Sequence, residues 1–252
     1  MNKEDLKKLA GSGNYIEGIY NYCDRWCERC QFTSRCLNFR LGQKKFGNLD
    51  ENDEMNEVFW QRFSEMLQST IDLLKEMAEE RGIDLDAADI EENKLEKKIS
   101  FTSSMAKNYI KLVDDWFNSP IGISATDEDE LKSSKTQENE IKFEDIVQII
   151  RWYQHQIYVK LERAIFSELH EKSDLLNGFP KDSEGSAKVA LIGIDRSIGA
   201  WGQMLKHFPY YENKIIKLIS FLERLRQIVE KRFPKARDFI RPGFDEIKKV
   251  RN

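Results

Sequence analysis

The four cysteines of the chain lie in one short stretch, as Cys23, Cys27, Cys30 and Cys36, with spacers of three, two and five residues. Cysteine thiolates bind zinc and iron–sulfur clusters, and cysteines gathered in one stretch indicate one shared site. In a reducing compartment such a group is more often a metal site than a set of disulfides. The stretch therefore predicts metal or cluster binding, although it names no reaction.

The same cysteines also allow a structural interpretation. Cys23, Cys27 and Cys30 are spaced i, i+4 and i+7, so on a continuous helix they would extend the apolar stripe that begins at Ile16. They would then be small buried side chains. This interpretation does not explain Cys36, and a helix would separate the end thiols by roughly 10 Å along its axis. A shared site therefore requires the helix to unwind near Cys27.

The compact spacing favours a 4Fe-4S cluster over zinc. Structural zinc usually takes its ligands from two short pairs separated by a longer insert, whereas a cubane has four separate iron corners. With all four corners ligated, the cluster would transfer electrons, sense redox state or stabilise the fold. Zinc is the alternative, and it would make the protein a zinc-stapled helical interaction module. Redox-active or buried thiols are a further possibility.

The cysteine stretch resembles known motifs. The run Tyr22–Cys30 (YCDRWCERC), with Phe32–Cys36 (FTSRC), resembles a motif of uncharacterised bacterial proteins and implies no activity. The C-x2-C-x5-C spacing of Cys27, Cys30 and Cys36 is similar to the last three ligands of the 4Fe-4S loop in endonuclease III-like DNA glycosylases. The first spacer differs, and the glycine hairpin of those enzymes is not recognisable.

A further spacing match concerns Cys23, Cys27 and Cys30, whose C-x3-C-x2-C pattern is that of the radical S-adenosylmethionine enzymes. That family commonly has an aromatic residue before the third cysteine, where this chain has Arg29. The strand–helix alternation of the family's barrel is also missing. Radical chemistry is therefore not expected.

A second candidate site combines a histidine with carboxylates. His155 and Glu162 share one face of a predicted helix with aromatic residues, and Asp195 lies among apolar residues of the next helix. They could form an acid–base or dimetal site of a bundle enzyme, joined by Glu57 or Glu65. The Glu-x-x-His pairs typical of ferritin-like dimetal proteins are absent from the sequence. The alternative is a salt bridge from Asp195 to a neighbouring helix, because a buried carboxylate needs a partner.

Apolar residues at helical spacing predict an all-α bundle of about six helices around these sites. A composition of 33% charged residues with only 5 Pro fits this class. We expect residues 1–50 to form an N-terminal helix and cysteine loop that caps a bundle over 51–252, with a mobile acidic loop at about 119–140. The expected helices lie at about 16–23, 52–81, 105–117, 142–170, 186–207 and 211–232.

The sequence also bears on the cellular location of the protein and on its binding partners. It has neither a signal-peptide pattern nor an apolar run of membrane-spanning length, so we expect a cytoplasmic protein without a membrane partner. Residues 201–252 hold 13 Lys or Arg and 6 Asp or Glu. This basic excess is compatible with nucleic acid, but a solvated helix face is favoured because no aromatic–basic motif accompanies it. A redox or protein partner fits the cysteine site better.

Overall fold

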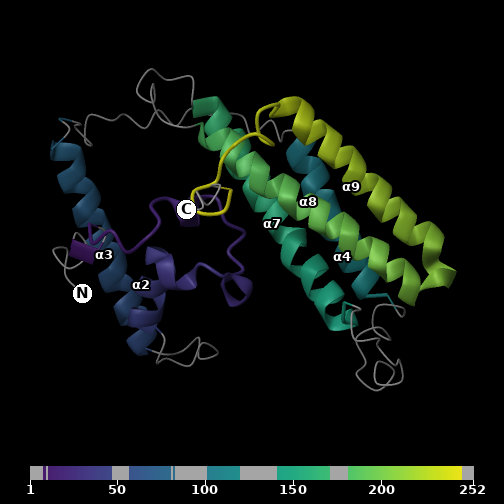
Figure 1. Ribbon diagram of the computed structural model, residues 1–252, viewed down its shortest axis with the longest axis horizontal. Helices are drawn as coiled ribbons and strands as arrows, with labels where there is room; N and C mark the ends of the chain where they lie inside the picture. The colour runs from purple at the N-terminus through teal and green to yellow at the C-terminus, as the bar shows by residue number, and fades with distance from the viewer. Residues whose placement is uncertain are drawn as a thin grey trace, which may run out of the picture. The chain divides into compact units, whose positions relative to one another are not determined.

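The computed structural model describes residues 8–9, 11–46, 57–80, 82, 101–119, 141–170 and 181–245. Six α-helices and several 3-10 turns make up the regular structure of these residues (Figure 1), and the predicted all-α class is confirmed. The acidic loop expected at about 119–140 lies outside the described residues except for Ser119. No helix in the described part is long and apolar enough to cross a membrane.

The chain divides into two units. The bundle unit comprises Asn21–Asp24, Lys98–Arg241 and Asp245–Asn252, and the N-terminal unit comprises the remaining residues. That the N-terminal residues cap the bundle stays a prediction.

Four helices build the bundle unit, namely α4 (Phe101–Phe117), α7 (Phe143–His170), α8 (Asp182–His207) and α9 (Glu212–Arg232). Each of α7 and α9 packs against both α4 and α8, as Figure 1 shows for α7, α8 and α9. The 3-10 turn Pro209–Tyr211 joins α8 to α9. These helices agree closely with the predicted ones, because each has a continuous apolar stripe that is buried against its neighbours.

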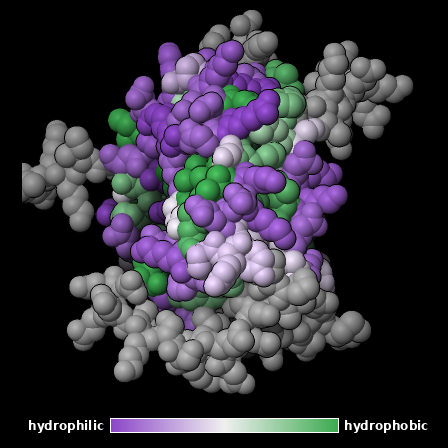
Figure 2. Space-filling view, turned by 90° about the vertical axis from the view of Figure 1, so that its right-hand side faces the viewer, coloured by the Kyte–Doolittle hydropathy of each residue, from purple (hydrophilic) through white to green (hydrophobic). Residues whose placement is uncertain are grey.

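Small and aromatic side chains fill the bundle core. A Cβ atom on Gly193 of α8 would lie 3.0 Å from the ring of Tyr153 and 3.1 Å from Ile157, so the glycine lets α7 approach closely. The fully buried Trp201 donates its indole hydrogen to Tyr109 Oη over 3.0 Å. Small residues of α8 therefore permit close packing against α7. Figure 2 shows a face on which hydrophobic residues lie among hydrophilic ones.

The N-terminal unit contains α2 (Leu37–Phe46) and α3 (Glu57–Glu80), preceded by short 3-10 turns at Cys27–Arg29 and Thr33–Arg35. The helix expected from about residue 16 is wrong, since Ile19–Asn21 forms only another 3-10 turn. Gly18 and Arg25 have φ values of 71° and 60°, which an α-helix cannot contain. The chain instead turns back, so that Ile16 N–H donates to Arg35 O over 3.0 Å.

Candidate functional site

The cysteine stretch folds as turns that leave all four thiols half-exposed. Cys27 begins one 3-10 turn, while Cys30 and Cys36 follow two successive turns in extended backbone conformations. The interpretation of Cys23, Cys27 and Cys30 as a buried helical stripe is therefore wrong. The unwinding near Cys27 that a shared site requires is present.

Backbone hydrogen bonds shape the turns and reach one of the sulfurs. Phe32 N–H donates to Cys30 Sγ over 3.4 Å, and Cys36 N–H donates to Thr33 O over 3.3 Å. A hydrogen bond to sulfur favours its charged thiolate form and, in metal centres, adjusts the properties of the bound metal. Cys30 is thus placed in surroundings suited to a thiolate ligand.

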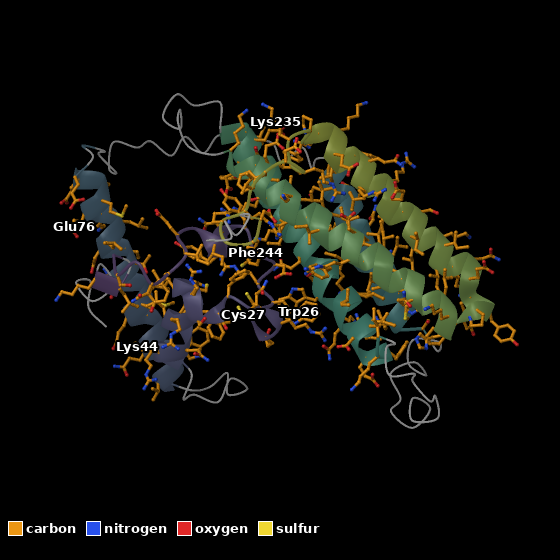
Figure 3. The ribbon with its side chains drawn as sticks, viewed as in Figure 1. Trp26, Cys27, Lys44, Glu76, Lys235 and Phe244 are labelled. Atoms are coloured by element: carbon orange, nitrogen blue, oxygen red, sulfur yellow. The ribbon has the colours of Figure 1, made fainter. Side chains whose placement is uncertain are left out.

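Basic residues surround the same turns. Arg25 and Arg35 are exposed, and the guanidinium of Arg29 lies over the Trp26 ring, 4.5 Å from its centroid. Figure 3 labels Trp26 beside Cys27, at the start of the 3-10 turn. Positive charge near several thiolates lowers the free energy of a negatively charged metal–thiolate centre. The stretch therefore supplies both the donor atoms and compensating charge.

The structure does not gather these donors into a closed ligand set. Cys23 belongs to the bundle unit, whereas Cys27, Cys30 and Cys36 belong to the N-terminal unit. Among the described residues, no three or more His, Cys, Asp or Glu side chains are arranged to hold a metal ion. Within the N-terminal unit, Cys27, Cys30 and Cys36 would have to rearrange to hold one metal ion.

Helices α7 and α8 hold the segment Asn21–Asp24, here called the anchor segment, which contains Cys23. Asp24 Oδ2 accepts hydrogen bonds from Tyr153 Oη over 2.5 Å and from Arg196 Nη1 over 2.8 Å. Arg196 also donates to Tyr153 Oη. Tyr153 is 1% exposed, so its hydroxyl depends on these partners.

Further donors from α7 bind the backbone of the anchor segment. Trp152 Nε1 and Gln156 Nε2 donate to Asp24 O over 3.0 and 2.9 Å, and Lys160 Nζ donates to Asn21 O over 3.4 Å. This role of α7 was not predicted from the sequence, because the partners lie more than a hundred residues apart. The sequence signal that could have indicated it is the indole donor of Trp152, which shares a helix face with polar residues such as Gln156.

Tyr22 fixes the other side of Cys23. A Cβ atom on Gly185 of α8 would lie 2.3 Å from the Tyr22 ring, which shows how closely the ring approaches the helix. Tyr22 also packs on Phe239 with ring centroids 4.7 Å apart. Its hydroxyl hydrogen-bonds to Asp182, which Arg163 binds through two nitrogens over 2.7 and 2.9 Å. Cys23 is thus flanked by two anchored residues.

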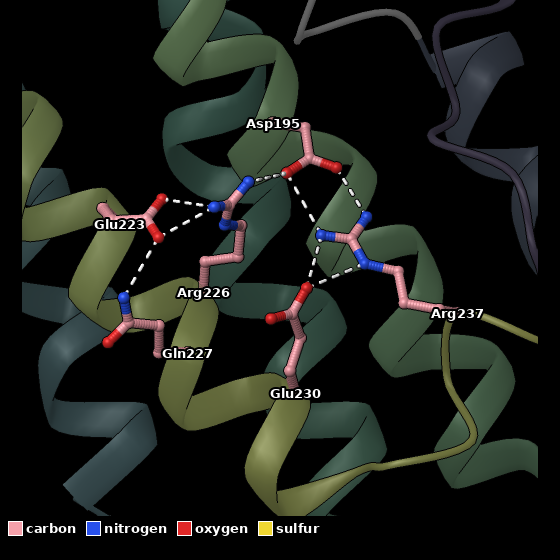
Figure 4. A network of polar contacts seen from close by, with 6 residues as sticks. All are labelled: Asp195, Glu223, Arg226, Gln227, Glu230 and Arg237. Carbon is pink, nitrogen blue, oxygen red and sulfur yellow. Dashed lines mark hydrogen bonds and ion pairs between the residues drawn. The ribbon is translucent and has the colours of Figure 1, made fainter.

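Asp195 of the second candidate site lies in an ion-pair network (Figure 4). Arg237 Nη1 contacts its Oδ2 over 2.5 Å, and Arg226 Nη1 lies 3.6 Å from its Oδ1. Arg237 also pairs with Glu230 over 2.8 Å, and Arg226 also pairs with Glu223 over 2.7 Å. The structure therefore shows the salt-bridge alternative for Asp195.

The other members of that site have different partners. His155 is exposed on α7, with its Nε2 atom 2.8 Å from Gln154 Nε2, and Glu162 accepts a hydrogen bond from Ser103 of α4. Glu65 is exposed on α3, and the side chain of Glu57 lies outside the described residues. Among the described residues these side chains do not form a group that could hold a metal ion, and we do not propose a bundle enzyme.

Comparisons with protein-family models, with curated proteins and with solved structures found no match to the chain. The function must therefore be inferred from its own residues.

Proposed function

We propose that Cys23, Cys27, Cys30 and Cys36 bind one 4Fe-4S cluster that has a redox, sensing or structural role. The observation that carries the proposal is that all four cysteines are only partly buried, with Cys27, Cys30 and Cys36 on or directly after short 3-10 turns. Cysteines that serve as small hydrophobic side chains are normally buried. Four half-exposed thiols close in sequence need another explanation, and metal binding supplies one.

The surroundings of the thiols support the same proposal. Phe32 N–H donates a hydrogen bond to Cys30 Sγ, and the three arginines of the stretch supply positive charge that would favour a negatively charged metal–thiolate centre. When bound, a fully ligated cluster supplies one-electron redox chemistry. The protein's part is to hold the thiolates and to adjust the potential through the Phe32 N–H···Sγ bond.

Cluster binding would also change the local structure. Because Cys27, Cys30 and Cys36 of the N-terminal unit are not arranged to hold a metal ion, part of the binding free energy would drive their rearrangement. The anchor segment is already held by α7 and α8, so we expect the turns after Cys27 to move more than Cys23 does. Loss of the cluster should therefore change the hydrogen exchange of the backbone amides mainly at residues 27–36.

Anaerobic purification followed by metal and sulfide analysis tests the proposal. A cluster predicts a brown protein with broad absorption near about 400 nm, and about four irons and four sulfides per chain. A colourless protein with about one zinc per chain would replace the cluster by the zinc-stapled module. A folded protein that takes up neither metal, even after reconstitution with iron and sulfide, would refute metal binding.

Single Cys→Ser variants identify the ligands. Cys27→Ser, Cys30→Ser and Cys36→Ser should each lower iron content and visible absorption severalfold, since serine is a poor ligand for a cluster. Ser34→Ala is the matched control, because Ser34 is exposed in the same stretch. Equal iron content in Cys30→Ser and Ser34→Ala would remove Cys30 from the ligand set.

A further inference from the structure

Helices α4 and α9 line a pocket of 440 Å³ that is open to solvent, here called the cavity; it is separate from the cysteine stretch in sequence and lies within the bundle unit. This volume is in the range of small-molecule sites, which are mainly apolar with a few polar groups. Its apolar lining is formed by Leu112 and Trp116 of α4 and by Leu218 and Phe221 of α9. An apolar ligand body would find complementary surface there.

Two lysines give the cavity its polar side. Lys214 and Lys217 are exposed, line the cavity and form no ion pair within the described part of the chain. Lys214 lies near the Tyr211 ring, 5.8 Å from its centroid. The facing carboxylate is that of Asp115, so the lining carries two positive charges and one negative charge.

The N-terminus of α9 adds to the positive side of the cavity. Lys214 lies in the first turn of Glu212–Arg232, where the helix dipole favours anions over cations, and Lys217 follows in the second turn. A bound anion would interact favourably with both ammonium groups and with this end of the helix. The same end would repel a cationic ligand.

We propose that this cavity binds a small amphipathic acid, whose apolar body contacts Trp116 and Phe221 and whose carboxylate or sulfonate pairs with Lys214 and Lys217. The apolar walls set the shape of the ligand, and the lysines set the sign of its charge. The proposal is independent of the cysteine site.

A charge series of ligands with one apolar chain tests it on the whole protein. Decanoate, decanol and decyltrimethylammonium, each below its micelle concentration, are titrated while the Trp indole N–H signals are followed by NMR. We expect decanoate to bind at least about tenfold more tightly than the cation, and to shift Trp116 but not Trp152, which is hydrogen-bonded to Asp24 O. Equal affinity for all three ligands, or shifts at Trp152 alone, would overturn the proposal.

Variants separate the two parts of the site. Lys214→Gln with Lys217→Gln should weaken decanoate binding about tenfold and leave decanol binding unchanged, whereas Lys231→Gln, on an exposed part of the same helix, should change neither. Leu112→Trp should fill the cavity and abolish binding of both ligands, and because Leu112 is 36% exposed the fold should tolerate it. Unchanged decanoate binding in Leu112→Trp would place the ligand elsewhere.

Discussion

Tyr153 of α7 donates its phenolic hydrogen to Asp24, with 2.5 Å between Oη and Oδ2, and so connects the residue after Cys23 to the core of the bundle unit. Burial, together with the hydrogen bond to this carboxylate, raises the pKa of Tyr153 well above its usual range, so the phenol stays a neutral donor. Arg196 completes the arrangement by binding the same carboxylate oxygen. The anchor segment is therefore expected to be a stable part of the bundle.

Replacing Asp24 should destabilise the bundle unit. Asp24→Ala leaves the buried Tyr153 hydroxyl without its acceptor, and we expect a loss of about 2 kcal/mol in the free energy of unfolding. Urea denaturation measures it, with Glu28→Gln as the exposed control in the same stretch. In a double-mutant cycle with Tyr153→Phe, a coupling energy near zero would contradict the importance of this hydrogen bond.

Two glycines of α8 should respond in opposite ways to alanine. In Gly185→Ala the new methyl would meet the rings of Tyr22 and Phe239 at 2.3 and 2.7 Å, so we expect a loss of about 2 kcal/mol and faster amide exchange in the anchor segment. Gly199→Ala meets nothing within 4 Å and should stabilise by up to about 1 kcal/mol through helix propensity. Stabilisation by both substitutions would show that Tyr22 does not pack against α8.

Asp195→Ala should have a small, salt-dependent effect. The side chains of Asp195, Arg226 and Arg237 are each more than a third exposed, so their ion pairs are screened by solvent. We expect a loss below about 1 kcal/mol that shrinks further in 1 M salt. A loss of several kcal/mol, independent of salt, would contradict this picture of a solvated network.

Acid should destabilise the bundle unit through Asp182 and Asp245. Burial opposes ionisation, but hydrogen bonds from Arg241 and Lys188 outweigh it and hold the pKa of Asp245 well below its usual range. Arg163 and Ser167 likewise lower the pKa of Asp182 against the effect of burial. Because both folded-state values lie below the unfolded value of about 3.9, this stability is complete above about pH 5 and is lost as the pH falls.

Unfolding curves between pH 2 and 7 check the acid effect. Asp245→Asn should lower stability by about 2 kcal/mol at pH 7 and should flatten the acid limb. Asp238→Asn is a suitable control, because Asp238 is an exposed neighbour in the same segment. If the free energy of unfolding falls equally steeply with decreasing pH in both variants, other carboxylates cause the acid effect.

Alkali should destabilise the core at Tyr109. Burial raises the pKa of Tyr109 to about 12, above its unfolded value of about 10. The neutral phenol therefore contributes stability that is complete below about pH 10 and is lost as the pH rises through about 12. Tyr109→Phe should reduce this alkaline loss and, since Trp201 loses its acceptor, lower stability at pH 7 by about 1 to 2 kcal/mol. Stability measurements at pH 7 and pH 11 separate the two effects.

The long helices of the bundle unit could be predicted from the sequence because their periodic apolar faces are local patterns. Residues 211–232 were expected to be helical, and α9 is Glu212–Arg232. The same periodicity failed at Ile16–Cys30, where the left-handed backbone of Gly18 and Arg25 and the hydrogen bond between Ile16 and Arg35 replace a helix. Local spacing cannot reveal a chain reversal that a distant partner stabilises.

For the candidate sites, too, some features follow from the sequence alone and others only from the tertiary structure. The sequence alone determined that four thiols and several arginines lie in one short stretch, because covalent spacing needs no fold. Only the tertiary structure decided that these thiols are half-exposed, that Asp24 is held by α7 and α8, and that Asp195 is paired with two arginines. Those outcomes depend on residues far apart in the chain, whose packing and hydrogen bonds exist only once the helices have assembled.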